Sequence, residues 1–122
     1  MPEELTEAQE AELVADLKRL TTALEQALRS SVESSQTVEL DQPIGRLSRM
    51  DAMQQQKMAA AARDRQKQRM AAVRSALTRA TEGDYGLCRS CDDDIGFPRL
   101  KARPETGLCL TCASQLEASR RR

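Results

Sequence analysis

Histidine and tryptophan are missing from this chain of 122 residues, and its only aromatic residues are Tyr85 and Phe97. Without histidine, the chain lacks the side chain that most often acts as a general base near neutral pH. With so few aromatic residues and 31% charged ones, it cannot bury a large globular core. This composition favours long helices paired along a narrow seam over a sandwich or a doubly wound sheet.

Long apolar segments are also missing. No run approaches the roughly 20 residues that a membrane-spanning helix needs, and residues 1–10 are acidic, unlike a secretory signal. We therefore expect a cytoplasmic protein with no membrane contact. In a reducing cytosol, grouped cysteines bind metals more often than they form disulfides.

The most informative feature that is present is a set of two CxxC pairs separated by 17 residues. Each pair can place two thiolates on one side of a metal ion, and the chain between the pairs can bring the second round to complete a tetrahedron. We predict one structural Zn²⁺ held by Cys88, Cys91, Cys109 and Cys112. Two disulfides or a redox-active CxxC are weaker alternatives, because no βαβ pattern accompanies the cysteines.

A zinc ion with four sulfur ligands has no open position for a substrate or an activated water. The chain also has no histidine and shows no activated nucleophile. We therefore predict that it is not an enzyme and has no catalytic residues.

Charge is distributed unevenly although the formal net charge is zero. Residues 1–43 carry ten acidic and three basic residues, whereas residues 44–82 carry nine basic and three acidic ones. Two antiparallel helices of opposite charge attract one another, so this division favours a helical hairpin.

The first helix of this hairpin is signalled by a capping box, Thr6-Glu-Ala-Gln9, and by a stripe of leucines at heptad-like spacing. The stripe consists of Leu13, Leu17, Leu20, Leu24 and Leu28. We expect the helix to end near Val32, where serines become frequent, and the tip of the hairpin to span about residues 34–50 around Pro43.

The second helix is predicted from about residue 46 to 80, a stretch without glycine or proline, and would be about 50 Å long. Its expected inward residues are Leu47, Met50, Met58, Ala61, Met70, Val73 and Leu77. We interpret Met50, Met53, Met58 and Met70 as soft filler of the seam between the helices.

Together these patterns predict a mostly α protein: a long antiparallel two-helix coiled coil, a small four-cysteine zinc finger and a short C-terminal helix. We place the hairpin in residues 1–82 and the finger with its helix in residues 83–122. Within the finger we expect a strand over residues 95–100 and a helix over residues 113–122. Tyr85 and Phe97 are expected to form a small apolar cluster.

Residues 83–112, GDYGLCRSCDDDIGFPRLKARPETGLCLTC, resemble the zinc finger of the DksA/TraR family. The resemblance rests on a Tyr-Gly approach to the first CxxC, on Arg-Leu-x-Ala-x-Pro between the pairs, and on Leu-Cys-x-x-Cys at the end. It implies a regulator of transcription that binds RNA polymerase directly and inserts the hairpin tip into the secondary channel. In some family members it also implies cooperation with ppGpp at the polymerase interface.

The tip of this chain departs from the Asp-x-x-Asp-x-Ala pattern of such regulators. Asp41 can stand for the first aspartate, but Ile44 occupies the position three residues on, and Asp51 precedes Ala52 directly. The predicted contact residues of the tip are Asp41, Arg46, Arg49 and Asp51. We expect a monomer that does not read DNA sequence.

Two other functions remain open. A zinc finger that binds DNA or RNA would use Arg89, Arg99, Lys101, Arg103 and the terminal arginines, and its binding would fall steeply with salt. A structural zinc adaptor without regulatory output would instead tolerate the altered tip.

Overall fold

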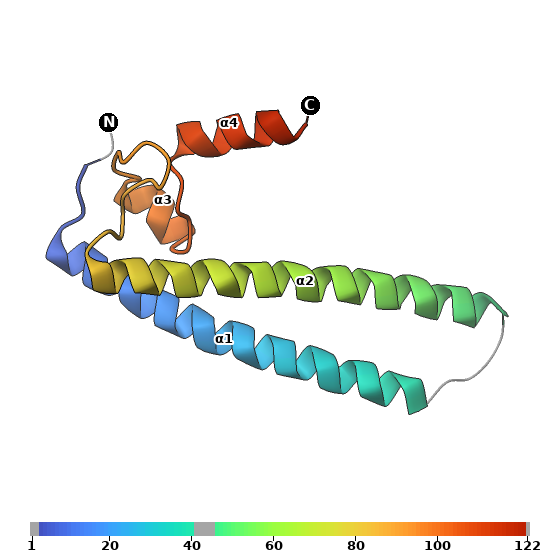
Figure 1. Ribbon diagram of the computed structural model, residues 1–122. Helices are drawn as coiled ribbons and strands as arrows, with labels where there is room; N and C mark the ends of the chain where they lie inside the picture. Colours follow the sequence, from blue (N-terminus) through green and yellow to red (C-terminus); the bar gives the residue numbers. More distant parts are fainter. Residues whose placement is uncertain (1–2, 41–45, 122) are drawn as a thin grey trace. The chain divides into compact units, whose positions relative to one another are not determined.

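The computed structural model describes the backbone of residues 3–40 and 46–121 and the side chains of residues 3–30 and 49–121. This part of the chain contains four helices: α1 (Glu7–Leu40), α2 (Arg46–Glu82), α3 (Phe97–Ala102) and α4 (Leu110–Arg120). Figure 1 shows α1 and α2 as the two long helices and the finger segments beyond α2. The prediction of a mostly α protein with two long contacting helices and a short C-terminal helix is confirmed.

Helix α1 begins with the predicted capping box. The Thr6 N–H donates to Gln9 Oε1 at 3.0 Å, and the Gln9 N–H donates to Thr6 Oγ1 at 3.1 Å. These reciprocal bonds satisfy two backbone donors that a helix start otherwise leaves unpaired. Leu13 and Leu17 of the predicted stripe are fully buried.

The predicted end of α1 near Val32 is wrong, because the helix continues to Leu40. Serine lowers helix propensity by only a few tenths of a kcal/mol relative to good helix formers, whereas glycine and proline lower it by about 1 and 3 kcal/mol. Neither residue occurs between Pro2 and Pro43. The serines therefore weaken the helix without ending it.

Helix α2 corrects the interpretation of the methionines. Met70 and Val73 are buried as predicted, but Met50, Met53 and Met58 are 64%, 58% and 72% exposed. At about 100° of rotation per residue, each of these three lies 100° or more around the helix from Met70. A single partner helix covers a narrower stripe than that, so they cannot fill the same seam as Met70.

The finger contains a helix where a strand was predicted. Residues 97–102 form α3, and the described part of the chain has only one isolated β-bridge, between Leu87 and Asp94. Gly96 precedes the helix with φ 98°, and Pro98 occupies its first turn. Proline lacks an N–H and has a backbone angle suited to a helix start, so it favours α3 over an extended strand.

Helix α4 starts earlier than predicted because Cys109 caps it. The Cys109 side chain accepts a hydrogen bond from the Cys112 N–H, and the helix runs from Leu110 to Arg120. None of its residues is buried, and Leu110 and Leu116 are 67% and 43% exposed.

Contacts divide the chain into two compact units. The first contains Met1–Thr21 and Ala71–Arg122, and the second contains Thr22–Met70. The finger thus shares a unit with the start of α1 and the end of α2. Among the described residues, no helix is apolar enough over a sufficient length to cross a membrane.

Candidate metal centre

The four cysteines converge in the first unit. Their Sγ atoms all lie within 4.8 Å of one another, and the Sγ atoms of Cys91 and Cys109 are 3.7 Å apart. Tetrahedral coordination with Zn–S distances of about 2.3 Å requires sulfur–sulfur separations of about 3.8 Å. The cluster therefore has the dimensions of a zinc site with four thiolate ligands, and all four cysteines are free thiols.

Local backbone geometry builds each half of this site. In the first half, the Ser90 N–H points at Cys88 Sγ at 3.4 Å, and Asp92 adopts φ 63° so that the chain turns back. In the second half, the Cys112 N–H points at Cys109 Sγ at 3.4 Å. Backbone N–H groups aimed at sulfur favour the thiolate, which is the form that binds a metal.

The pKa values of the cysteine thiols explain why the cluster needs a bound cation to ionise fully. Burial disfavours the Cys88 thiolate, but backbone N–H groups of residues 109, 91 and 90 outweigh burial and lower the Cys88 pKa to about 6. At Cys91 the Asp93 backbone lowers the pKa, yet burial and the neighbouring thiols raise it to about 12. Four adjacent thiolates repel one another, so all four ionise together only around a positive ion.

Several contacts hold the loops of the finger around this cluster. The Arg89 N–H donates to the Gly107 carbonyl at 2.8 Å, which links the two cysteine-bearing segments. The Tyr85 hydroxyl donates to the Pro104 carbonyl at 2.8 Å. Burial and the negative charge of Glu105 raise the Tyr85 pKa, so this hydroxyl stays protonated. Leu100 is completely buried; Phe97, expected beside Tyr85, is only half-buried.

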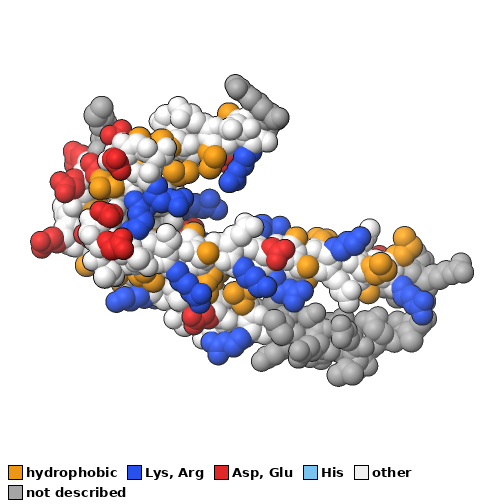
Figure 2. Space-filling model, in the orientation of Figure 1, with side chains coloured by type: hydrophobic (Ala, Val, Ile, Leu, Met, Phe, Trp, Pro, Cys, Tyr) orange, Lys and Arg blue, Asp and Glu red, His pale blue; other side chains and the backbone are white. Residues whose placement is uncertain are grey.

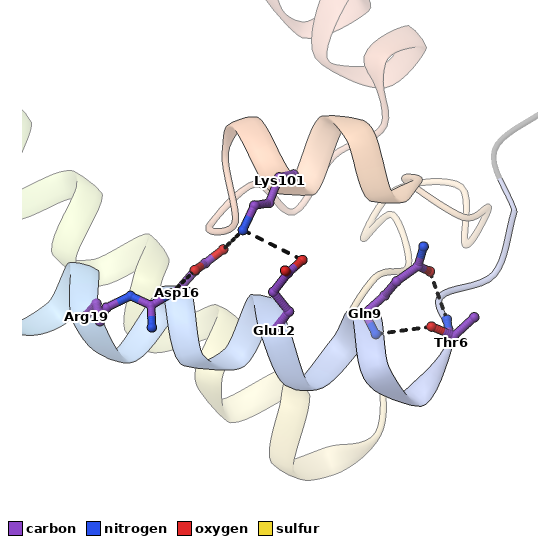
Figure 3. Close-up of polar contacts among 6 residues, drawn as sticks. All are labelled: Thr6, Gln9, Glu12, Asp16, Arg19 and Lys101. Atoms are coloured by element: carbon purple, nitrogen blue, oxygen red, sulfur yellow. Dashed lines mark hydrogen bonds and ion pairs between the residues drawn. The ribbon is translucent and has the colours of Figure 1, made fainter.

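An ion pair that the sequence did not reveal joins α3 to α1. Figure 3 shows the Lys101 ammonium directed at Asp16 and Glu12 of α1, at 2.9 Å and 3.7 Å. The hydrogen bond from Lys101 is the main reason that the Asp16 pKa is lowered, and Asp16 in turn raises the Lys101 pKa. Lys101 lies 85 residues from Asp16 in sequence and outside the basic segment of residues 44–82, so the charge pattern did not predict this contact.

Two basic residues near the cysteines make contacts within the first unit. Lys101 and Arg99 are two of the residues that a finger binding DNA or RNA would use. Instead, Lys101 pairs with carboxylates of α1, and Arg99 Nε donates to the Leu108 carbonyl at 3.1 Å. Arg79 at the end of α2 donates to the Asp84 and Leu87 carbonyls.

The predicted tip residues lie in the second unit or outside the described residues. Asp41 and the Arg46 side chain are outside the described part of the structure. Arg49 and Asp51 are exposed near the beginning of α2. Their role in binding a partner stays a prediction.

The fold and the cysteine cluster define the class of protein: a four-cysteine zinc-finger protein built on a hairpin of two long helices. Residues 83–118 match the family model described as the prokaryotic dksA/traR C4-type zinc finger. That description and the donor set agree with one structural Zn²⁺.

Comparison of the whole chain extends this match beyond the finger. The chain is 30% identical over 111 residues to proteins named "RNA polymerase-binding transcription factor DksA" from Escherichia coli K12 and Salmonella typhimurium. Each alignment covers 88% of this chain and 73% of the relative. The solved structure of transcription factor DksA2 from Pseudomonas aeruginosa aligns with a TM-score of 0.77 and 25% identity. The structural alignment covers 95% of this chain and 88% of the DksA2 chain.

This chain therefore belongs to the DksA family. The family consists of transcription factors and not of enzymes, which confirms the prediction that the chain is not an enzyme.

Proposed function

We propose that this chain regulates transcription by binding RNA polymerase directly, with its helical hairpin entering the secondary channel. The observation that carries the proposal is the similarity over 88% of the chain to proteins named as RNA polymerase-binding transcription factors. This similarity includes the hairpin as well as the finger, so it is more than a shared zinc site.

The second unit has dimensions that suit insertion into a narrow opening. It contains residues 22–40 of α1 and residues 46–70 of α2, and these segments give roughly 30 Å and 40 Å of helix. Two paired helices are only about 20 Å wide. A globular domain of similar mass is wider than this.

A competition experiment tests the proposed binding site. A fluorescently labelled DksA protein from Escherichia coli is bound to core RNA polymerase, and this chain is added as an unlabelled competitor. We expect displacement at micromolar concentration. Binding of this chain without displacement would contradict the secondary channel as the site, and no binding at all would contradict the whole proposal.

The tip residues are tested separately in a transcription assay with purified polymerase. The variants D41N, R46A, R49A and D51N should reduce the effect of this chain on transcript yield. D64N serves as a matched control, because Asp64 is another aspartate of α2 in the second unit. If wild type itself leaves transcript yield unchanged, a structural adaptor without regulatory output explains the chain better. If D41N and D51N behave like D64N, these two aspartates do not carry the effect. Adding ppGpp to the same assay tests whether it cooperates with this protein.

Nucleic-acid binding receives less support from the structure, because Lys101 and Arg99 are engaged within the first unit. A steep fall of affinity for random duplex DNA with salt would nevertheless favour it over polymerase binding.

A further inference from the structure

The three exposed methionines of α2 form a surface distinct from the cysteine cluster. Met50, Met53 and Met58 are more than half exposed, whereas Met70 on the same helix is 5% exposed. Relative to Met70 they lie at rotations of about 100° to 240°, so all three share the side of α2 opposite the buried residue. Figure 2 shows hydrophobic side chains at the surface of the beginning of α2. We call the surface formed by Met50, Met53 and Met58 the methionine face.

The composition of this part of α2 resembles that of a binding surface. Between residues 50 and 58 only Asp51 and Lys57 are charged, and three consecutive glutamines separate Met53 from Lys57. Residues 63–69 of the same helix carry five charges in seven positions. Cores of protein interfaces are enriched in methionine and depleted of charge, and flexible thioethers adapt to irregular partner surfaces. The methionine face therefore differs from an ordinary solvated helix surface.

Exposure of these side chains also makes this face accessible to oxidants. We propose that Met50, Met53 and Met58 are sites of reversible oxidation by hydrogen peroxide, and that their oxidation weakens the binding of α2 to RNA polymerase. The second part of this proposal rests on the proposed function, whereas the first part depends only on exposure.

The chemical step is a two-electron oxidation of each thioether. A sulfur lone pair attacks one oxygen of hydrogen peroxide, the O–O bond breaks, an S=O bond forms, and the other oxygen leaves as water. Methionine sulfoxide reductases reverse the step by using thiol reductant. The product is a strongly polar side chain, and burying it in an interface without a hydrogen-bond partner is unfavourable.

Mass spectrometry of the zinc-loaded full chain tests the reactivity. Peptides are quantified at increasing times of treatment with hydrogen peroxide. We expect Met50, Met53 and Met58 to gain one oxygen each, and Met70 to react about tenfold more slowly, because it reacts only after local opening. In urea the four rates should become similar. Equal rates in the folded protein would overturn the proposed sites.

Affinity measurements test the consequence for polymerase binding. Wild type, M50L/M53L/M58L and M70L are each compared with their own untreated samples after identical peroxide treatment. Treatment should weaken wild type and M70L about tenfold and should leave the affinity of the triple variant unchanged relative to its untreated sample. Leucine favours helix at least as well as methionine, so the triple variant should fold.

Peroxide can also oxidise the cysteines. Comparison of wild type with the triple variant distinguishes the effect of methionine oxidation on affinity from the effect of cysteine oxidation. Equal losses in wild type and the triple variant would assign the effect to the thiols and overturn the proposal. If untreated wild type fails to bind polymerase, the proposed function fails, but the pattern of sulfoxides still decides whether the sites are correct. If untreated wild type binds and treated wild type binds equally well, only the regulatory inference fails.

Discussion

The Nζ atom of Lys101 lies 2.9 Å from Oδ2 of Asp16, and this contact ties the finger helix α3 to α1 within the first unit. The two side chains come from different parts of the protein, since one belongs to the hairpin and the other to the zinc finger. Their pairing adds a contact between the finger and α1 that does not involve the metal ligands.

Removal of either partner should weaken this attachment. We expect K101M and D16N to lower the free energy of unfolding of the zinc-loaded protein slightly and by similar amounts, because both groups are partly solvated. The double variant should lose less than the sum of the two single losses, because the contact between Lys101 and Asp16 is counted in both, whereas the contacts of Asp16 with Arg19 and of Lys101 with Glu12 are counted once each. Urea unfolding of all four proteins measures this, and additive losses would show that the two residues act independently.

The same pair has a defined pH dependence. The folded-state pKa of Asp16 is lowered, chiefly by Lys101, so its stabilisation is present above the unfolded-state pKa of about 3.9. It is lost as the pH falls through the lower folded-state pKa. The difference in unfolding free energy between wild type and D16N should therefore shrink in strong acid. A difference that stays constant would contradict the assignment to this carboxylate.

Metal removal should disorder the finger without melting the long helices. Because the chain has no tryptophan and one tyrosine, the fluorescence of Tyr85 reports on the finger alone. A chelator should release one zinc per chain and change this fluorescence, while circular dichroism retains most of the helical signal from α1 and α2. Structural zinc contributes on the order of 10 kcal/mol in small fingers.

Cysteine variants provide the matched comparison for that experiment. C88S should lose zinc, because Cys88 is a fully buried member of the cluster. S90A should keep zinc, because the residue 90 backbone N–H that points at Cys88 Sγ remains and the serine hydroxyl, which bonds to Cys112, is not one of the four sulfur ligands. A finger that keeps its tyrosine signal after zinc release would show that the protein loops suffice for its structure.

Alanine substitutions at three glycines distinguish the effect of backbone strain on stability from the effect of steric contact. Gly86 has φ +95°, and an added Cβ would lie 2.9 Å from Leu5 Cδ1; Gly83 has φ +86° with no atom within 4 Å of that position. We expect G86A to lower the free energy of unfolding by roughly 2–3 kcal/mol and G83A to lower it by roughly 1–2 kcal/mol. At Gly107 an added Cβ would meet the flexible Arg89 side chain, so G107A should cost about 1 kcal/mol or less.

Denaturant unfolding of the zinc-loaded variants measures whether the loss of stability is largest for G86A, smaller for G83A and smallest for G107A. L5A should recover part of the loss in the G86A background, because it removes the contact but not the backbone strain. Equal losses for G86A and G83A would show that Leu5 adjusts freely.

The capping box at the start of α1 should also be measurable. T6A removes the acceptor for the Gln9 N–H and should lower the free energy of unfolding by about 1 kcal/mol. T78A is the control, because Thr78 Oγ1 only bonds back to the Arg74 carbonyl of its own helix. A loss for T78A as large as that for T6A would show that threonine replacement itself, and not the cap, is responsible.

Local patterns were predicted best. The cysteine spacing, the capping box, the leucine stripe and the long stretches without glycine or proline depend on neighbours within a few residues, so they can be recognised directly in the chain. The strand predicted over residues 95–100 failed because a short, mostly apolar segment fits a strand or a short helix equally well. Gly96 and Pro98 favoured the helix.

Contacts between distant segments could not be predicted in this way. Nothing near Lys101 in sequence indicates that its partner is Asp16, and methionine at helical spacing does not reveal which face of α2 is covered. Exposure of Met50, Met53 and Met58 follows from rotation around the helix relative to Met70, which requires knowledge of where the partner helix lies.

The amino-acid sequence by itself determined the two long helices, the C-terminal helix and the four sulfur ligands, because hydrogen bonding within a helix and thiolate chemistry are local. Only the tertiary structure decided which carboxylate Lys101 meets, how the two CxxC pairs close on one another, and which methionines remain in solvent. These depend on packing between segments far apart in the chain, where many pairings are compatible with the same local pattern.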